Sequence, residues 1–206
     1  NQKWYSQVPD AFRLAFLPAD SPEGRQYRNW MQLSMDFAAE NREKMMLTVK
    51  AILEKWIGTY TDLTLDFSGE INCHHNYAAL ESHRGKELWG HRKGAVEAKN
   101  GQRAVIPGAM GSYSYVVMGL GNEESFCSSS HGAGRRYSRK GAMEAFRCEE
   151  VILDLERQGV VLGKKGKADV AEESRFAYKD IEEVMENQKD LVIPLKRLKT
   201  IGVVKG

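Results

Sequence analysis

The sequence is poor in cysteine. Its 206 residues include only Cys73, Cys127 and Cys148, an odd number with no pair at the C-x-x-C spacing. A disulfide framework needs paired cysteines and a zinc finger needs closely spaced ones, so the pattern argues against both as the basis of the fold. Unpaired thiols suit a reducing compartment, and we therefore expect a cytoplasmic protein.

Long apolar runs are also missing. No stretch approaches the roughly 20 apolar residues of a membrane-spanning helix, and no cationic segment followed by an apolar one opens the sequence. Internal repeats and low-complexity linkers are absent too. Hydrophobic residues make up 42% and charged residues 28%, a balance typical of a globular rather than a disordered chain. We expect no membrane partner.

Neither sign of charge dominates. The formal net charge is +2, so overall charge does not indicate a nucleic-acid-binding protein. Basic residues nevertheless gather locally, at Arg135 to Lys140, at Lys164 to Lys167 and at Lys196 to Lys199. Such clusters could follow a phosphate backbone, or they could be solvated parts of an ordinary surface.

A long amphipathic helix is predicted near the start of the chain. Ser21 and Pro22 are typical of a helix N-terminus, and apolar residues then recur at helical spacing from Tyr27 to Trp56, as far as Gly58. We interpret this helix as scaffold, with its methionines filling a core. The chain starts at Asn1 without methionine and reaches this helix almost at once, so we expect a fragment.

The rest of the chain predicts a mixture of strands and helices. Alternation at Leu63, Leu65 and Phe67 predicts a strand, and short apolar pieces between glycine turns continue a β-rich region to about residue 130. The remaining expected elements are a helix from about 142 to 159, a strand at 160–162, a turn at 163–167, a helix at 176–187 and a strand from 194 to the end. The expected fold class is α+β, with mixed β-sheets, the long helix and flanking helices.

One histidine is surrounded by small residues. Ser130, Gly132 and Gly134 flank His131 closely, and Arg135 follows. Small residues let backbone amides approach a phosphate, and a helix beginning soon after Gly134 would add its amino end. A neutral imidazole can attack phosphorus. The alternative is a glycine-rich turn with a hydrogen-bonding histidine.

Three other segments could carry chemistry. His74, His75 and Asn76 follow the predicted strand; imidazole suits manganese or zinc, although adjacent strand residues point to opposite faces and a structural pair is the alternative. The Pro107 to Tyr115 segment combines a glycine turn with hydroxyl donors and could hold phosphate or a nucleobase edge, with a plain tight turn as the alternative. His91 to Gly94 could bind a polyanion or face water. The apolar end predicts a strand that would direct Lys205 to a definite place, with an edge strand and a solvated lysine as the alternative.

These segments together resemble the RtcB-type RNA-splicing ligases. The matching residues occur in the family's order from about residue 70 onward, and the helix from Pro22 to Met46 resembles the one that precedes this half of the family. They are His75-Asn76, His91-Arg92-Lys93-Gly94, Pro107-Gly108-x-Met110-Gly111 with Ser114, His131-Gly132-Ala133-Gly134-Arg135, Ala177-Tyr178-Lys179 and Gly202-Val203-Val204-Lys205-Gly206. The resemblance implies that residues 1–206 are the carboxy-terminal part of one catalytic domain whose amino-terminal half is absent.

The resemblance also implies a reaction. The family joins an RNA 3′-phosphate or 2′,3′-cyclic phosphate to a 5′-hydroxyl in tRNA splicing and RNA repair, using GTP and Mn²⁺, through a guanylylated histidine. His131 would be that histidine and His75 one manganese ligand. GTP would lie among Asn76, the loop of Pro107, Gly108, Ala109 and Met110, then Ser114, Gly132, Ala133, Gly134, Tyr178 and Lys205. Arg92, Lys93 and Arg135 would contact RNA.

The chain departs from the family pattern at three points. Ala109 stands where serine is usual, so one hydroxyl donor is missing, and Arg175 stands where proline is common. The other metal ligands belong to the absent half, while a catalytic metal generally has about three protein ligands. An inactive nucleotide- or RNA-binding module, or a structural fragment of a longer enzyme, therefore remains an alternative. The expected partners are RNA and GTP, and an activating helper protein is left open.

Overall fold

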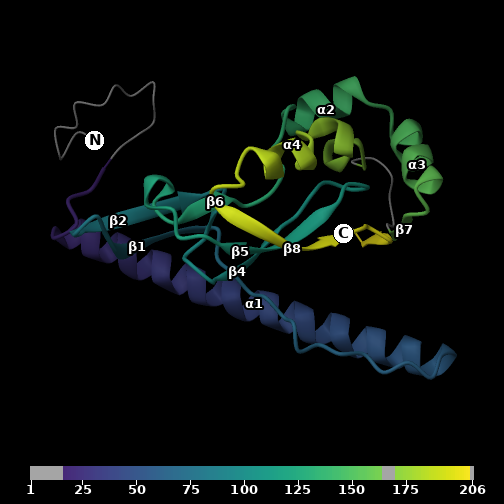
Figure 1. Ribbon diagram of the computed structural model, residues 1–206, viewed down its shortest axis with the longest axis horizontal. Coiled ribbons are helices and arrows are strands. Elements are labelled where there is room, and N and C mark those ends of the chain that lie inside the picture. The colour runs from purple at the N-terminus through teal and green to yellow at the C-terminus, as the bar shows by residue number, and fades with distance from the viewer. Residues whose placement is uncertain (1–15, 164–169, 205–206) are drawn as a thin grey trace. The chain divides into compact units, whose positions relative to one another are not determined.

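The computed structural model describes residues 16–163 and 170–204. The chain divides into two compact units, residues 1–68 and 69–206 (Figure 1). The first unit consists mainly of one helix. The second contains every strand found in the described residues, together with the remaining helices.

The first unit is built on α1 (Pro22–Tyr60), which confirms the predicted long helix. The Ser21 hydroxyl accepts a hydrogen bond of 2.9 Å from the Gly24 amide, and Pro22 occupies the first turn, as expected for an N-terminus. Large apolar side chains along α1 remain exposed, for example 61% of Met45 and 53% of Trp56. The expectation that its methionines fill a core is therefore not met within this unit.

The predicted strand at Leu63 to Phe67 is wrong. Residues 61–75 form no strand, and Leu63 is 72% exposed. Alternating hydrophobicity alone does not make a strand, because the backbone also needs a partner to hydrogen-bond with. The first strand begins at Asn76, so His75 and Asn76 lie at the start of a strand rather than after one.

Four small sheets form the second unit. β1 (Asn76–His83) and β2 (Lys86–Lys93) make an antiparallel hairpin, turned by Arg84 and Gly85 in left-handed conformations. Two further antiparallel sheets join β3 (Ala95–Glu97) with β6 (Ser128–Ser130), and β4 (Arg103–Ile106) with β5 (Ser114–Gly119) and β8 (Val192–Leu198). The fourth pairs β7 (Val161–Gly163) in parallel with β9 (Gly202–Val204).

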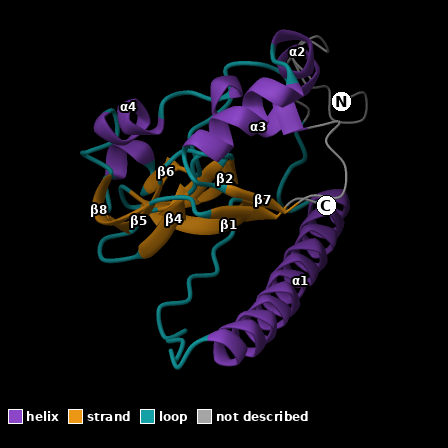
Figure 2. Ribbon diagram, turned by 90° about the vertical axis from the view of Figure 1, so that its right-hand side faces the viewer, coloured by secondary structure: helices purple, strands orange, loops and turns teal. Residues whose placement is uncertain are grey.

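Helices α2 (Arg139–Ala145), α3 (Cys148–Arg157) and α4 (Ile181–Glu186) lie on the same side of these strands (Figure 2). Short 3-10 turns occur as η3 (Glu123–Ser125), η4 (Val170–Glu173) and η5 (Arg175–Ala177). The fold is thus a mixed α and β arrangement with small sheets, in agreement with the expected class.

Several predicted elements are divided in the structure. The single helix expected up to residue 159 is two, because Phe146 and Arg147 are extended and the Phe146 ring packs against Tyr137 and Phe176. The helix expected at 176–187 is only α4, and the last strand is split into β8 and β9. The turn expected at 163–167 falls mostly outside the described residues.

Two apolar clusters support the loops between these elements. One contains Ile106, Val117 and Ala133, and the other contains Met110 and Leu155. Ile106 and Met110 flank the Pro107 loop, and Ala133 lies in the loop after His131. Both glycine-rich loops are therefore anchored in packed interior rather than held only at the surface.

Candidate functional site

His75 and His131 lie face to face. Their ring centroids are 5.4 Å apart and their planes differ by 4°. Gly94 joins the two segments, since its amide donates to the His75 carbonyl (3.2 Å) and to Asn76 Oδ1 (3.3 Å), while its carbonyl accepts from the His131 amide (3.4 Å). Residues far apart in the sequence are thereby brought to one place.

Both histidines are partly exposed. His75 and His131 are half-buried, and Asn76 is exposed. A neutral imidazole can attack phosphorus or bind a metal ion. The arrangement therefore combines a potential nucleophile with a potential metal ligand in one stack.

The two glycine-rich loops lie directly against each other. The Pro107 carbonyl accepts a 3.2 Å hydrogen bond from the Ala133 amide, and the Ser114 hydroxyl accepts one of 3.1 Å from the Gly108 amide. A Cβ at Gly108 would meet the Tyr113 carbonyl at 2.0 Å, and one at Gly132 would meet the Pro107 carbonyl at 3.1 Å. Close backbone packing thus explains these glycines.

Met110 and Ala133 contribute to this site differently from the ring residues. Both side chains are buried, with exposed fractions of 9% and 5%. The Met110 amide also donates to the Glu173 carbonyl at 3.3 Å. Their side chains anchor the loops, and half-buried Ala109 is the more accessible neighbour in the Pro107 loop.

Tyr178 is held beside the His131 loop by Arg135. The Arg135 guanidinium lies 4.8 Å from the ring centroid, and its Nη1 donates to the phenol oxygen at 2.9 Å. The phenol in turn donates to the Glu173 carboxylate. Burial, reinforced by Glu173, raises the pKa of Tyr178, so its hydroxyl stays protonated. The ring lies beside Arg135 and also packs against the apolar cluster that contains Ile106.

Backbone contacts tie this segment to the loop. The Lys179 amide donates to the Gly134 carbonyl at 2.9 Å, and Arg135 pairs with Tyr178 in an isolated antiparallel bridge. Arg135 also donates to the Tyr137 and Glu172 carbonyls. Its guanidinium is largely committed to protein partners, which limits the RNA contact expected of it.

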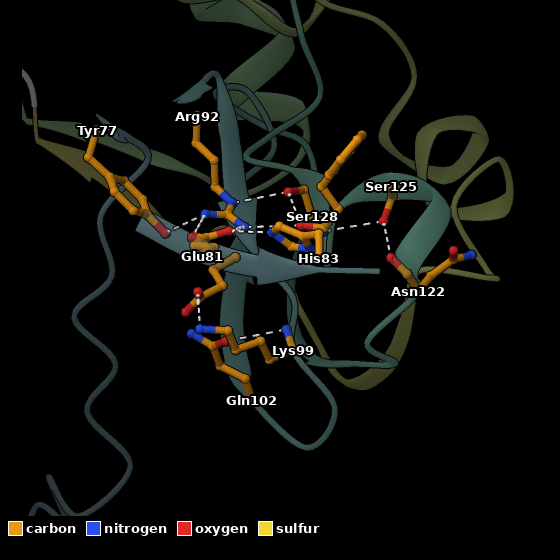
Figure 3. A network of polar contacts seen from close by, with 11 residues as sticks. Tyr77, Glu81, His83, Arg92, Lys99, Gln102, Asn122, Ser125 and Ser128 are labelled. Carbon is orange, nitrogen blue, oxygen red and sulfur yellow. Dashed lines mark hydrogen bonds and ion pairs between the residues drawn. The ribbon is translucent and has the colours of Figure 1, made fainter. Parts of the chain in front are cut away.

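The expectation that Arg92 contacts RNA needs correction. Its side chain is 4% exposed, and its five N–H groups donate to Glu81, Tyr77, Ser128 and Phe126 (Figure 3). No donor is left for a phosphate. Lys93, next on β2, points the other way and is exposed, so it remains available.

Glu81 and His83 were not singled out from the sequence. Both are buried on β1, and His83 Nε2 lies 2.7 Å from Glu81 Oε2. Burial alone would raise the pKa of the Glu81 carboxyl, but hydrogen bonds from Arg92 and His83 outweigh it, and the net effect lowers that pKa. Two polar residues at i and i+2 on one strand were the available signal.

The described residues do not complete a metal site. Among residues 16–163 and 170–204, no three His, Cys, Asp or Glu side chains are placed to hold one ion together. His75 therefore stands as a single candidate ligand, short of the three that a catalytic metal generally has. The donor set present does not by itself fit manganese.

α2 begins at Arg139 and has seven residues, so no helix starts directly after Gly134 to face an anion. Lys205 lies outside the described residues. In the part of the chain that the structure describes, none of the helices has the length and apolar character needed to span a membrane.

Comparison with known proteins gives a consistent result. The family model described as tRNA-splicing ligase RtcB matches residues 1–206. The chain is 45% identical over 181 residues to the RNA-splicing ligase RtcB of Escherichia coli K12, covering 86% of this chain and 42% of that protein. It is 33% identical over 218 residues to the RNA-splicing ligase RtcB of Mycobacterium tuberculosis, covering 97% and 49%. The chain thus spans less than half the length of these relatives.

Proposed function

Since this chain belongs to the RtcB family of tRNA-splicing ligases, we propose that it forms the part of a GTP-dependent RNA ligase that carries the nucleophile, His131. The observation that carries the proposal is the parallel stack of His131 on His75, 5.4 Å apart. It puts the proposed nucleophile beside the one histidine proposed as a metal ligand. Asn76 and the Pro107 loop adjoin it through Gly94 and Ala133.

The proposed reaction has three steps. A ring nitrogen of His131 forms a bond to the α-phosphorus of GTP, the bond to the bridging oxygen breaks, and pyrophosphate leaves. An RNA 3′-phosphate oxygen then displaces His131 from that phosphorus. The 5′-hydroxyl of a second RNA end attacks the activated 3′-phosphate, loses its proton, and GMP leaves. A 2′,3′-cyclic phosphate would first be opened by water.

The residues around His131 have distinct proposed tasks. The Pro107 loop with Ser114 and the Gly132 and Gly134 amides would surround the GTP phosphates, since backbone amides and hydroxyls suit anions, while the Ala133 amide holds the Pro107 carbonyl. Tyr178 would lie against the guanine, and Lys205 would reach the nucleotide. Lys93 is the proposed RNA contact. Manganese would supply neutralisation of phosphate charge, and its remaining ligands would have to come from outside the described residues.

A direct experiment tests this function. The native protein, with any sequence beyond residues 1–206, is incubated with GTP labelled at the α-phosphate and with Mn²⁺, then denatured and run on a gel. We expect label that survives denaturation and is lost in His131→Ala. His91→Ala, which changes an exposed histidine on β2, should keep it. Label retained in His131→Ala would refute the assignment.

A module that binds nucleotide without chemistry is the second candidate. The observation that favours it is Ala109, where the hydroxyl usual in the family is missing. In that case the native protein would bind GTP with measurable affinity but would carry no label after denaturation. Equilibrium binding measured beside the labelling assay separates the two functions.

A further inference from the structure

Arg92 connects three segments of the second unit from the inside. Its Nε donates to Ser128 Oγ, one Nη1 hydrogen to Tyr77 Oη, and one Nη2 hydrogen to the Phe126 carbonyl, each at 3.0 Å. The remaining two hydrogens go to the two oxygens of Glu81. Figure 3 shows the guanidinium between Tyr77, Glu81 and Ser128. All five N–H groups of the guanidinium therefore donate hydrogen bonds, and its charge is balanced by the buried Glu81 carboxylate.

The partners of Arg92 lie next to the two stacked histidines in the chain. Tyr77 is on β1 two residues after His75, and Ser128 is on β6 three residues before His131. β6 ends at Ser130, so His131 follows directly from the strand whose first residue Arg92 holds. One side chain therefore fixes both the strand that starts beside His75 and the strand that ends beside His131.

The segment that Arg92 holds has a strained backbone. Phe126 and Cys127 have φ of +53° and +49°, and neither is glycine. Consecutive left-handed residues of this kind persist only where surrounding contacts impose them, and such strain gathers at functional sites. Here Arg92 grips the Phe126 carbonyl, and Cys127 is bound through its amide to the Asn122 carbonyl (2.9 Å) and through its carbonyl to the Ala98 amide (2.7 Å).

The strain has a geometric result. The two left-handed residues turn the chain sharply between η3 and β6, so that β6 can pair with β3 in the register Ala95 to Ser130. That register sets where His131 emerges relative to Gly94. Without the grip on Phe126 and Ser128, relaxation of the turn would move the start of β6 and hence the His131 ring.

We propose that Arg92 is a positioning residue that holds the His131 ring in register with His75 for attack on the nucleotide. This inference rests on the proposed function. Lysine cannot replace arginine in this role, because an ammonium group has three donors and cannot span four partners in a plane. Small misplacements of reacting groups lower rates strongly, by as much as about 100-fold for 1 Å.

The test uses variants that remove the contacts of Arg92 with Tyr77 and Ser128 or the guanidinium itself, and these are called the clamp variants. Tyr77→Phe and Ser128→Ala each delete one acceptor and leave Arg92 in place, while Arg92→Lys deletes the fork. Arg103→Lys, on exposed Arg103 of β4, is the matched control. In the native protein with Mn²⁺, the single-turnover rate of His131 labelling at saturating GTP should fall about tenfold or more for the clamp variants. The GTP concentration for half-maximal labelling should change by less than about twofold.

A second readout does not depend on the ligase reaction. Diethyl pyrocarbonate modifies accessible imidazoles, and mass spectrometry of peptides gives the rate for His131 relative to exposed His91. The relative rate should change severalfold in the clamp variants and stay constant in Arg103→Lys. Melting curves identify the folded fraction, and Tyr77→Phe and Ser128→Ala serve if Arg92→Lys does not fold.

The outcomes are distinguishable. Folded clamp variants that label at the parent rate and show unchanged His131 modification would overturn the positioning role. A lower labelling rate with unchanged half-maximal GTP supports it. If the parent protein takes no label, the proposed function fails, and the modification rates alone decide whether Arg92 sets the His131 ring.

Discussion

Gly94 lies directly against the His131 ring. A Cβ on Gly94 would be 3.3 Å from Cε1 and 3.4 Å from Nδ1 of that imidazole, and its φ is +71°. Only glycine combines this left-handed backbone with the missing side chain that the ring requires. The glycine thereby sets how closely the His75 strand and the His131 loop approach.

Gly94→Ala should lower both stability and labelling. The left-handed backbone costs alanine about 1 kcal/mol, and the methyl group pushes on His131. Gly85→Ala is the matched control, because Gly85 has φ +75° with nothing within 4 Å of a Cβ. We expect a similar loss in the free energy of unfolding for both variants and slower labelling in Gly94→Ala alone. Equal labelling rates would contradict contact between residue 94 and the nucleophile.

Ala109→Ser should tighten GTP binding. The substitution restores the hydroxyl usual in the family, in a half-buried position of the Pro107 loop. One added hydrogen bond contributes about 1 kcal/mol, or roughly a fivefold lower Kd. Isothermal titration with GTP measures the change, and Ala79→Ser on β1 should leave the Kd unaltered. A weaker or unchanged affinity would show that the hydroxyl finds no partner on the nucleotide.

Glu81→Gln should make the free energy of unfolding less dependent on pH. The folded pKa of Glu81 is lowered, so its ionised form stabilises the fold above the ordinary carboxyl pKa. That contribution is lost as the pH falls through the lowered value. Breaking one side of a buried ion pair costs about 3 kcal/mol. Urea unfolding at pH 7 and at a series of lower pH values should show the variant less stable at pH 7, with a difference that shrinks in acid. A constant difference at all pH values would contradict this account.

Tyr178→Phe and Tyr178→Leu should behave differently toward GTP. Phenylalanine keeps the flat ring and loses only the hydroxyl shared with Glu173 and Arg135. Leucine removes the stacking surface, which is worth about 1–3 kcal/mol against a base. The GTP Kd should rise about tenfold or more for leucine and much less for phenylalanine. Similar Kd values for both variants would remove guanine stacking from the proposal.

The sequence correctly predicted the elements that depend mainly on neighbouring residues, such as helix caps and short strands between turns. The start of α1 follows from Ser21 and Pro22, and β4 and β5 follow from short apolar runs between glycine turns. The strand expected at Leu63 failed because pairing depends on a distant segment, which composition does not reveal. Boundaries such as the break at Phe146 depend on ring packing formed only in the tertiary structure.

At the candidate site, too, local sequence identified some residues, whereas other contacts depend on the tertiary structure. The glycine-rich setting of His131 singled it out from the sequence, and the structure brings it to His75. Arg92 was misjudged, because a basic residue beside Lys93 gives no sign that Glu81 lies near it. The hairpin places Arg92 opposite Tyr77 and Glu81 opposite Leu88, so Arg92 reaches Glu81 along the strand rather than directly across it. A register of this kind is fixed by turn geometry and burial together.

The parallel pairing of β7 with β9 has a consequence for biosynthesis. Val161–Gly163 can acquire its partner only after residues 202–204 have left the ribosome, and Val203 packs on the Leu155 cluster. That cluster also contains Met110, next to the Pro107 loop. Nascent chains that still lack β9 therefore have this part of the interior open, and protection from protease at α3 should appear only after residues 202–204 have been made.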